Sequence, residues 1–168
     1  IEPGGVQWMT AGRGIVHSEM PEQEDGLLRG FQLWVNLPAR AKMTAPAYQE
    51  FPPSHTPLER RPDGTEIRVI AGRTETGTEG AVKNQFVHPT YLDVSLPGST
   101  ACEQTGDHDD TAFVFVIDGA VTVGERSGRV GRRTLGLLGP GERIAGTAGA
   151  GGGRLLLWAA RRLRDPVA

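Results

Sequence analysis

The chain has 168 residues and a mass of 18.0 kDa, which suits one ordinary domain or two small ones. A net charge of −2 and a pI of about 6.1 exclude a broad basic field for nucleic acid. There is no apolar run of about 18 residues and no secretory signal, so a membrane span is excluded. The single cysteine, Cys102, cannot form a disulfide within the chain, and a cytoplasmic location is the default expectation.

Glycine contributes 24 residues and proline 12, roughly twice their usual share. Both residues break helices, so the composition argues against a helical bundle and favours short strands joined by turns. Alternating or continuous apolar patterns mark the expected strands. These are residues 31–37, 66–70, 90–96, 112–117, 120–123, 135–138 and 155–160. The run 112–117 is expected to be buried on both faces, and Asp118-Gly119 after it predicts a hairpin turn.

Proline-rich stretches divide the chain at residues 51–84, which are expected to be a linker or crossing segment. An internal repeat relates PGGVQWMTAG at residues 3–12 to PGERIAGTAG at 140–149. A strand series precedes the second copy, whereas only two residues precede the first. We therefore expect residues 1–50 to be the C-terminal part of a first domain that lacks its front, and residues 85–168 to be a second domain.

His17 and Glu19 are the residues with the clearest chemical potential. In an extended strand, positions i and i+2 project from one face, so the imidazole and carboxylate would form half of a metal site. Such a pair with open positions favours non-haem Fe(II), whereas imidazole alone also suits Zn, Cu and Ni. The alternative is a surface strand whose His and Glu face water. Residues 154–160, after the second repeat copy, carry no such pair, so strand architecture does not require it.

The segment GGVQWMTAGRGIVHSEMP, followed by FQLWVNLP, closely resembles the pirin family. Weaker similarity continues through residues 43–50, 91–94, 113–124 and 138–142. The resemblance implies an all-β fold of two tandem cupin (jelly-roll) β-barrels, the first incomplete here and the second nearly complete. It also implies one metal, usually iron, held by three histidines and one glutamate in the first barrel. His17 and Glu19 match two of these ligands. The other two belong to an H-P-H-R-G segment expected upstream of Ile1, and family members also continue beyond Ala168.

Several bacterial pirins are associated with cleavage of the central ring of flavonols such as quercetin. The resemblance therefore implies a quercetin 2,3-dioxygenase-type oxygenase when the protein is full length, acting on a flat aromatic substrate without a nucleic-acid or membrane partner. Glu19 would serve as metal ligand and as base, and His17 as a structural ligand. The alternative is an iron-dependent regulator that binds partner proteins without turnover. A third interpretation is that the 168-residue chain, with two ligands, binds no metal and is inactive.

The remaining candidate residues are expected to be structural or solvated. His55 lies in a proline-rich loop, His88 precedes Pro89 at a strand entry, and His108 lies in an acidic turn. The three tryptophans, Trp8, Trp34 and Trp158, are expected in the core. Because an incomplete barrel exposes strand edges and apolar interior, the isolated chain is expected to be prone to aggregation.

Overall fold

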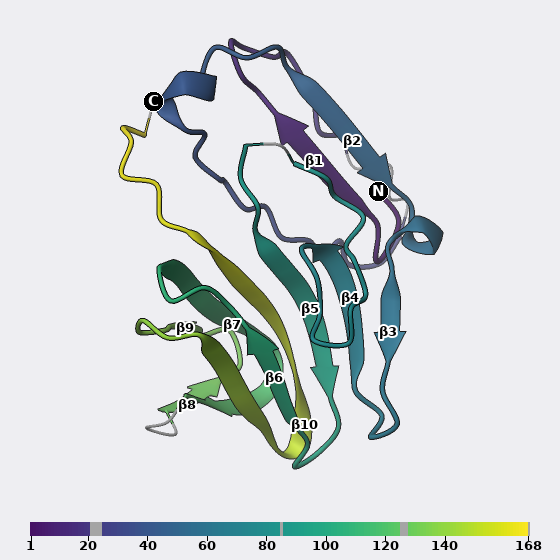
Figure 1. The fold of residues 1–168 in the computed structure, drawn as a ribbon. Coiled ribbons are helices and arrows are strands. Elements are labelled where there is room, and N and C mark those ends of the chain that lie inside the picture. The colour runs from purple at the N-terminus through teal and green to yellow at the C-terminus, as the bar shows by residue number, and fades with distance from the viewer. Residues whose placement is uncertain (21–24, 85, 125–127, 168) are drawn as a thin grey trace.

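The computed structural model describes residues 1–20, 25–84, 86–124 and 128–167 (Figure 1). Strands dominate this part of the chain, as the composition predicted, and its only helical elements are two single turns of 3₁₀ helix. The elements are β1 Val6–Thr10, η1 Ala39–Ala41, β2 Ala47–Phe51, η2 Pro53–His55, β3 Leu58–Arg60, β4 Glu66–Ala71, β5 Thr90–Leu96, β6 Ala101–Thr105, β7 Asp110–Val123, β8 Gly128–Gly131, β9 Leu135–Leu137 and β10 Arg143–Arg161.

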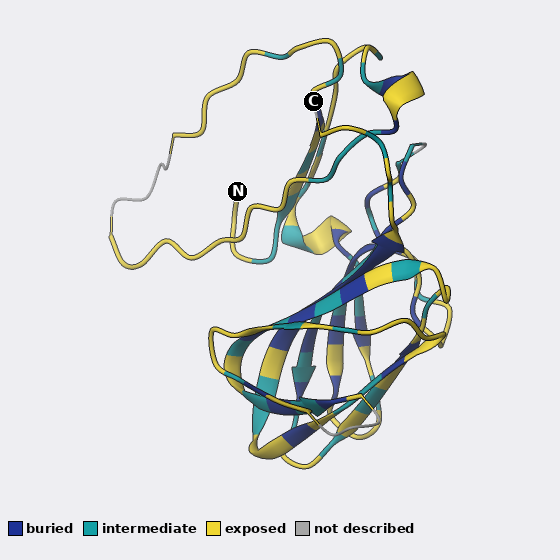
Figure 2. Ribbon diagram, turned by 90° about the vertical axis from the view of Figure 1, so that its left-hand side faces the viewer, coloured by how far each residue is buried: buried dark blue, intermediate teal, exposed yellow. Residues whose placement is uncertain are grey.

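The larger sheet has eight antiparallel strands in the order β3-β4-β5-β10-β7-β8, with β6 also paired to β10 and β9 to β7. The 19-residue β10 is the central strand of this sheet, because it pairs with β5, β6 and β7. Figure 2 shows the sheet curling around a buried interior, which is the jelly-roll arrangement expected of a cupin. The expected strands at 66–70, 90–96, 135–138 and 155–160 are confirmed.

The core follows from the alternation along these strands. Leu92, Val94 and Leu96 of β5 are buried as predicted, and they lie in one core cluster with Leu155 and Leu157 of the neighbouring strand β10. In β7, alternate side chains at 112, 114 and 116 are buried, while those at 113, 115 and 117 are only partly covered. The expectation that 112–117 is buried on both faces is therefore wrong. The partly covered face of β7 contacts an aromatic side chain from another segment, since Phe31 packs on Phe115.

The hairpin predicted at Asp118-Gly119 is also wrong, because β7 continues through both residues to Val123. The register between β7 and β10 shifts here, between Ala148 and Gly153. Gly119 has a φ of +72°, and a Cβ on it would lie 2.2 Å from the carbonyl oxygen of Gly152. The glycine thus lies beside a β-bulge in the pairing of two long strands, and not in a turn that ends a strand.

The smaller sheet consists of β1 and β2, paired antiparallel from Val6↔Phe51 to Thr10↔Ala47. Its inner side chains Val6, Trp8 and Phe51 pack on Ile70, Ala71 and Val82 beside the larger sheet. β3 and β4, from the proline-rich region expected to link the domains, belong to the larger sheet. The division into 1–50, 51–84 and 85–168 stays a prediction.

Residues 31–37 form no strand, so that prediction is wrong. No strand of the described residues pairs with this segment. Phe31 packs edge-on against Phe115 of β7, with ring centroids 5.5 Å apart. At the other end, the Asn36 side-chain amide donates to the carbonyl oxygens of Asp165 and Pro166, at 3.3 Å each. Figure 1 shows the C-terminus beside η1 as a result, and the backbone N–H of Ala39 donates to the Asp165 carboxylate.

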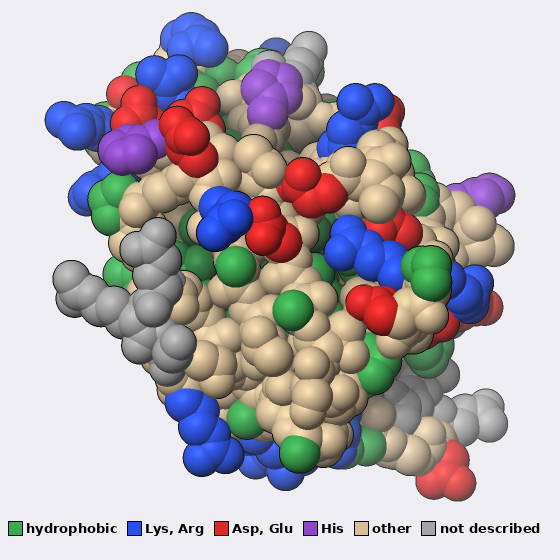
Figure 3. All heavy atoms as spheres, turned by 60° about the horizontal axis from the view of Figure 1, so that its bottom comes forward, with side chains coloured by type: hydrophobic (Ala, Val, Ile, Leu, Met, Phe, Trp, Pro, Cys, Tyr) green, Lys and Arg blue, Asp and Glu red, His purple; other side chains and the backbone are tan. Residues whose placement is uncertain are grey.

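The tryptophans divide between core and surface. Trp158 is buried as predicted and Trp8 is partly buried, but Trp34 is 88% exposed, contrary to prediction. Figure 2 draws most of the segment after β1 as exposed and away from the larger sheet. On the face shown in Figure 3, acidic and basic side chains are intermixed. Some of the exposed charges form ion pairs, such as Arg132–Asp118 and Arg143–Glu103. Each such pair contributes little to stability.

Candidate functional site

His17 and Glu19 lie in the segment that follows β1. The segment is not a strand, so the strand expected there is wrong. A turn ends β1, because the N–H of Gly14 donates to the carbonyl of Ala11 and the N–H of Arg13 to that of Thr44. Gly12 has a positive φ (+53°), which glycine adopts without strain. A Cβ at this position would lie 2.2 Å from the Thr44 carbonyl oxygen, so the turn requires glycine.

The imidazole and the carboxylate nevertheless lie on the same side of the chain. His17 Nε2 is 3.8 Å from Glu19 Oε1, and the two side chains are 46% and 63% exposed. They face solvent outside the sheets, as in the alternative of a water-facing pair, and not the interior of a first barrel, where the family resemblance implies the metal site. In the described residues, the pair is an exposed two-donor arrangement.

The distance between the two donors tests whether they fit one metal ion. Ligand atoms about 2.1 Å from a common ion lie at most roughly 4.2 Å apart, so 3.8 Å allows both to bind it at a wide angle. No group of three or more His, Cys, Asp or Glu side chains that could hold a metal occurs within residues 1–20, 25–84, 86–124 and 128–167. The pair therefore fits as half of a ligand set and needs further donors for tight binding.

Gln32 is a contact of the pair that the sequence interpretation missed. Its side-chain nitrogen donates to both oxygens of Glu19, at 3.1 Å to Oε1 and 3.4 Å to Oε2. Tyr48 of β2 also lies near: the pKa of its phenol is raised, by burial first and then by the negative charges of Glu50 and Glu19. The available signal was the alternation of residues 31–37, which places Gln32 on the polar face.

The other histidines are where the sequence predicted. His55 and His88 are exposed, and β5 begins two residues after His88. His108 is exposed and lies 3.6 Å from the Asp109 carboxylate. None of the three is near His17 in the described structure in a way that assembles a metal site.

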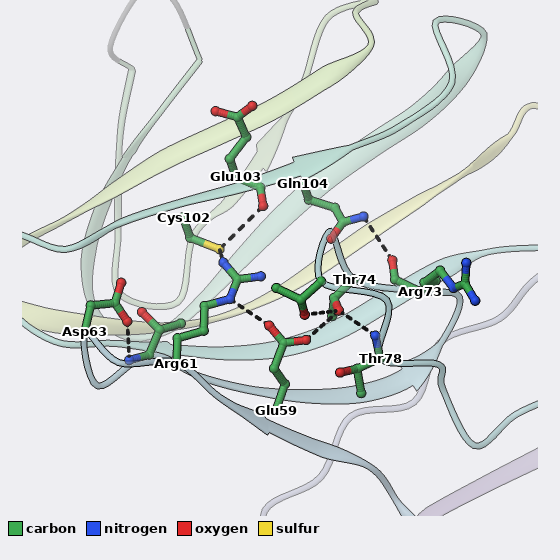
Figure 4. A network of polar contacts seen from close by, with 11 residues as sticks. Glu59, Arg61, Asp63, Arg73, Thr74, Thr78, Cys102, Glu103 and Gln104 are labelled. Carbon is green, nitrogen blue, oxygen red and sulfur yellow. Dashed lines mark hydrogen bonds and ion pairs between the residues drawn. The ribbon is translucent and has the colours of Figure 1, made fainter.

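A second polar cluster, shown in Figure 4, joins β3 to β6 and was not predicted. Arg61 Nε donates to Glu59 Oε1 at 2.7 Å, and the hydroxyl of Thr74 donates to Glu59 Oε2. Burial alone would raise the pKa of Glu59, but hydrogen bonds from Thr74, Thr76, Arg61 and Thr78 lower it to about 2. The cluster therefore holds a buried, ionised carboxylate against a guanidinium.

Cys102 lies on the other side of that guanidinium, with Arg61 Nη1 3.8 Å from its sulfur. Burial raises the pKa of the thiol, and the charge of Arg61 offsets only part of this. The interior next to Cys102 is lined by apolar side chains such as Val94, Val114 and Leu157, and its free volume is about 20 Å³. A space of that size holds about one water molecule, so it offers no room for a drug-sized ligand.

The sequence of this chain is similar to those of known proteins. The profile of the pirin family matches residues 1–35, which include His17, Glu19 and Gln32. A pirin-like protein of Caulobacter vibrioides is 47% identical over 167 residues, 99% of this chain and 59% of that protein. This chain belongs to the pirin family. The resemblance read from the sequence motifs is confirmed.

Solved structures share the fold of this chain. A quercetin 2,3-dioxygenase from Acinetobacter baumannii superimposes with a TM-score of 0.83 at 30% identity, over 97% of this chain and 57% of that one. A protein of Geobacillus kaustophilus gives the same TM-score and identity over 99% of this chain and 67% of that one. The expected all-β cupin class is confirmed. This pirin chain spans about three fifths of the length of the curated relative it matches.

Within the part of the chain that the structure describes, there is no helix with the length and hydrophobicity that a membrane span requires.

Proposed function

We propose that the full-length form of this pirin is a metal-dependent oxygenase of the quercetin 2,3-dioxygenase type, with His17 and Glu19 as two of the ligands of one iron ion. The observation that carries the proposal is the 3.8 Å approach of His17 Nε2 to Glu19 Oε1 within the segment that the family profile matches. The structural similarity to a quercetin 2,3-dioxygenase over almost the whole chain supports the reaction class.

The bound iron would supply open positions for oxygen and a flavonol, and would polarise the flavonol oxygens as a Lewis acid. His17 would contribute a neutral imidazole nitrogen that holds its place throughout. Glu19 would contribute one carboxylate oxygen to the ion and accept the proton of the flavonol hydroxyl at the other. An ionised carboxylate has lone pairs enough for both tasks.

The surroundings of the pair favour a flat, largely apolar substrate. Val16 and Met20, which flank the ligands in sequence, are exposed apolar side chains, and Trp34 of the facing segment is exposed as well. Sites for small molecules are lined mainly by such side chains with a few polar groups for orientation. The apolar cavity beside Cys102, with a volume of about 20 Å³, is too small for such a substrate.

The test measures the loss of quercetin under air, by its absorbance, with the iron-loaded protein from the complete coding sequence. Glu19→Gln keeps the shape but removes the base and the charged ligand, and we expect at least a 100-fold loss of turnover. His55→Ala removes an exposed histidine far along the chain from the pair and serves as the matched control, with unchanged turnover. Turnover no greater than that of the metal-free protein would refute the proposal.

A further inference from the structure

The amide of Gln32 contacts both oxygens of the proposed ligand Glu19. Its Nε2 lies 3.1 Å from Oε1 and 3.4 Å from Oε2. A carboxylate only accepts hydrogen bonds, so the nitrogen of the amide, and not its oxygen, must face Glu19. The orientation of the Gln32 side chain is therefore set by chemistry as well as by distance.

Contact with both oxygens restrains the rotation of the Glu19 carboxylate about its last bond. The amide is neutral, so it orients the carboxylate without cancelling the charge that makes it a ligand for a cation. Groups that hydrogen-bond to a metal ligand in this way orient it and tune its basicity. The remaining lone pairs, including one on the Oε1 that faces His17, stay available to an ion.

The backbone on both sides of Gln32 is anchored to other parts of the chain. Phe31 packs against Phe115 of β7 at a ring-centroid distance of 5.5 Å. The side-chain nitrogen of Asn36 donates to the backbone carbonyls of Asp165 and Pro166, and its side-chain oxygen Oδ1 accepts from Lys42 Nζ at 2.7 Å. The residues near Gln32 are therefore held by contacts with the larger sheet and with the C-terminal segment, which do not involve the segment of Glu19.

We propose that Gln32 is a positioning residue that fixes the carboxylate of Glu19 for metal binding. The proposal rests on the assignment of Glu19 as a ligand in the proposed function. It goes beyond that assignment, because it gives a residue outside the proposed ligand set control over the affinity and the coordination geometry of the ion.

The experiment titrates Co²⁺ into the metal-free protein from the complete coding sequence, and follows the visible absorption bands of the bound ion. Gln32→Met keeps the length of the side chain and removes the donor, and Gln32→Leu removes the donor with a branched chain. We expect the Kd for Co²⁺ to rise 10- to 100-fold in both variants, with a changed band pattern and an unchanged melting temperature.

Gln7→Met is the matched control. Gln7 Nε2 donates to Glu50 Oε1 at 3.2 Å on the exposed face of β1 and β2, so the variant loses a similar Gln–Glu contact outside the site. Its Kd and spectrum should equal those of the unmodified protein. A Kd within twofold of that protein and an unchanged spectrum for both Gln32 variants would overturn the proposal, and so would failure of the unmodified protein to bind Co²⁺. Absence of quercetin turnover, with the Kd shifts present, would refute the proposed function and leave the role of Gln32 standing.

Discussion

Arg61 and Glu59 form an ion pair that is largely withdrawn from solvent, with 2.7 Å between Nε and Oε1 and exposed side-chain fractions of 18% and 8%. Two residues apart, they join the end of β3 to the turn that leads into β4, and the guanidinium continues to Cys102 on β6 (Figure 4). Because Nη2 of Arg61 is buried without a hydrogen-bond partner, loss of the carboxylate would leave a poorly compensated buried charge.

Glu59→Gln is expected to destabilise the protein by roughly 3 kcal/mol at pH 7, because it breaks a buried pair on one side only. The pKa of Glu59 is about 2 in the folded protein and ordinarily 4.5. A lowered folded-state pKa stabilises the protein fully above the ordinary value, and that contribution is lost as the pH falls from 4.5 towards 2. The variant should lack this acid-dependent loss, which urea unfolding at pH 7, 4.5 and 3 would measure.

Glu66→Gln is the matched control for that series. Glu66 Oε1 pairs with Arg60 Nε at 2.9 Å, but the side chains are 48% and 69% exposed. Exposed pairs contribute at most about 1 kcal/mol, so this variant should remain close to the unmodified protein. Equal losses in the two variants would contradict a special role for the buried pair.

Gly119→Ala is expected to lower the free energy of unfolding by roughly 2 kcal/mol or more. The added Cβ would lie 2.2 Å from the Gly152 carbonyl oxygen, and the positive φ is unfavourable for any L side chain. Gly131→Ala in β8 is the control, because its Cβ would meet no atom within 4 Å. Thermal unfolding of both variants tests the bulge, and a melting temperature for Gly119→Ala equal to that of Gly131→Ala would contradict it.

The strand predictions were correct where the predicted strand has a neighbouring strand to pair with. The alternation of β5 and the apolar runs of β7 and β10 correctly predicted strands. These strands form because they pair with one another within the chain. Residues 31–37 carry an equally clear alternation, yet they form no strand, because no strand of the described residues pairs with them. Periodicity reports which face a strand would bury, but it does not report whether a partner is present.

The candidate site was predictable in the same partial way. Spacing alone placed His17 and Glu19 on one side of the chain, and the structure brings them to 3.8 Å. The contact from Gln32 joins residues 13 positions apart through a loop, and no local pattern encodes it. Asp118-Gly119 has the composition of a hairpin turn, but the pairing of β7 with a long β10 overrides that local preference.

Leu92→Ala is expected to lower the free energy of unfolding by about 2 to 5 kcal/mol, because the side chain is 1% exposed in the centre of the larger sheet. Truncation there leaves a cavity among tightly packed neighbours. Leu137→Ala removes the same atoms from a side chain that is 71% exposed, so it should change stability by less than about 0.5 kcal/mol. Urea unfolding compares the two, and similar values would place the core elsewhere.

The apolar side chains after β1 are expected to make the 168-residue chain associate at high concentration. Val16, Met20, Leu27 and Trp34 are each at least 70% exposed, and Figure 2 shows their segment away from the larger sheet. Exposed apolar groups gathered in one part of a surface promote association. Trp34→Ser should therefore raise the concentration at which light scattering begins several-fold without lowering the melting temperature. Leu137→Ser, a polar substitution of a side chain on β9 that is 71% exposed, is the control. An onset concentration that rises equally in the two variants would show that association does not depend on the segment after β1.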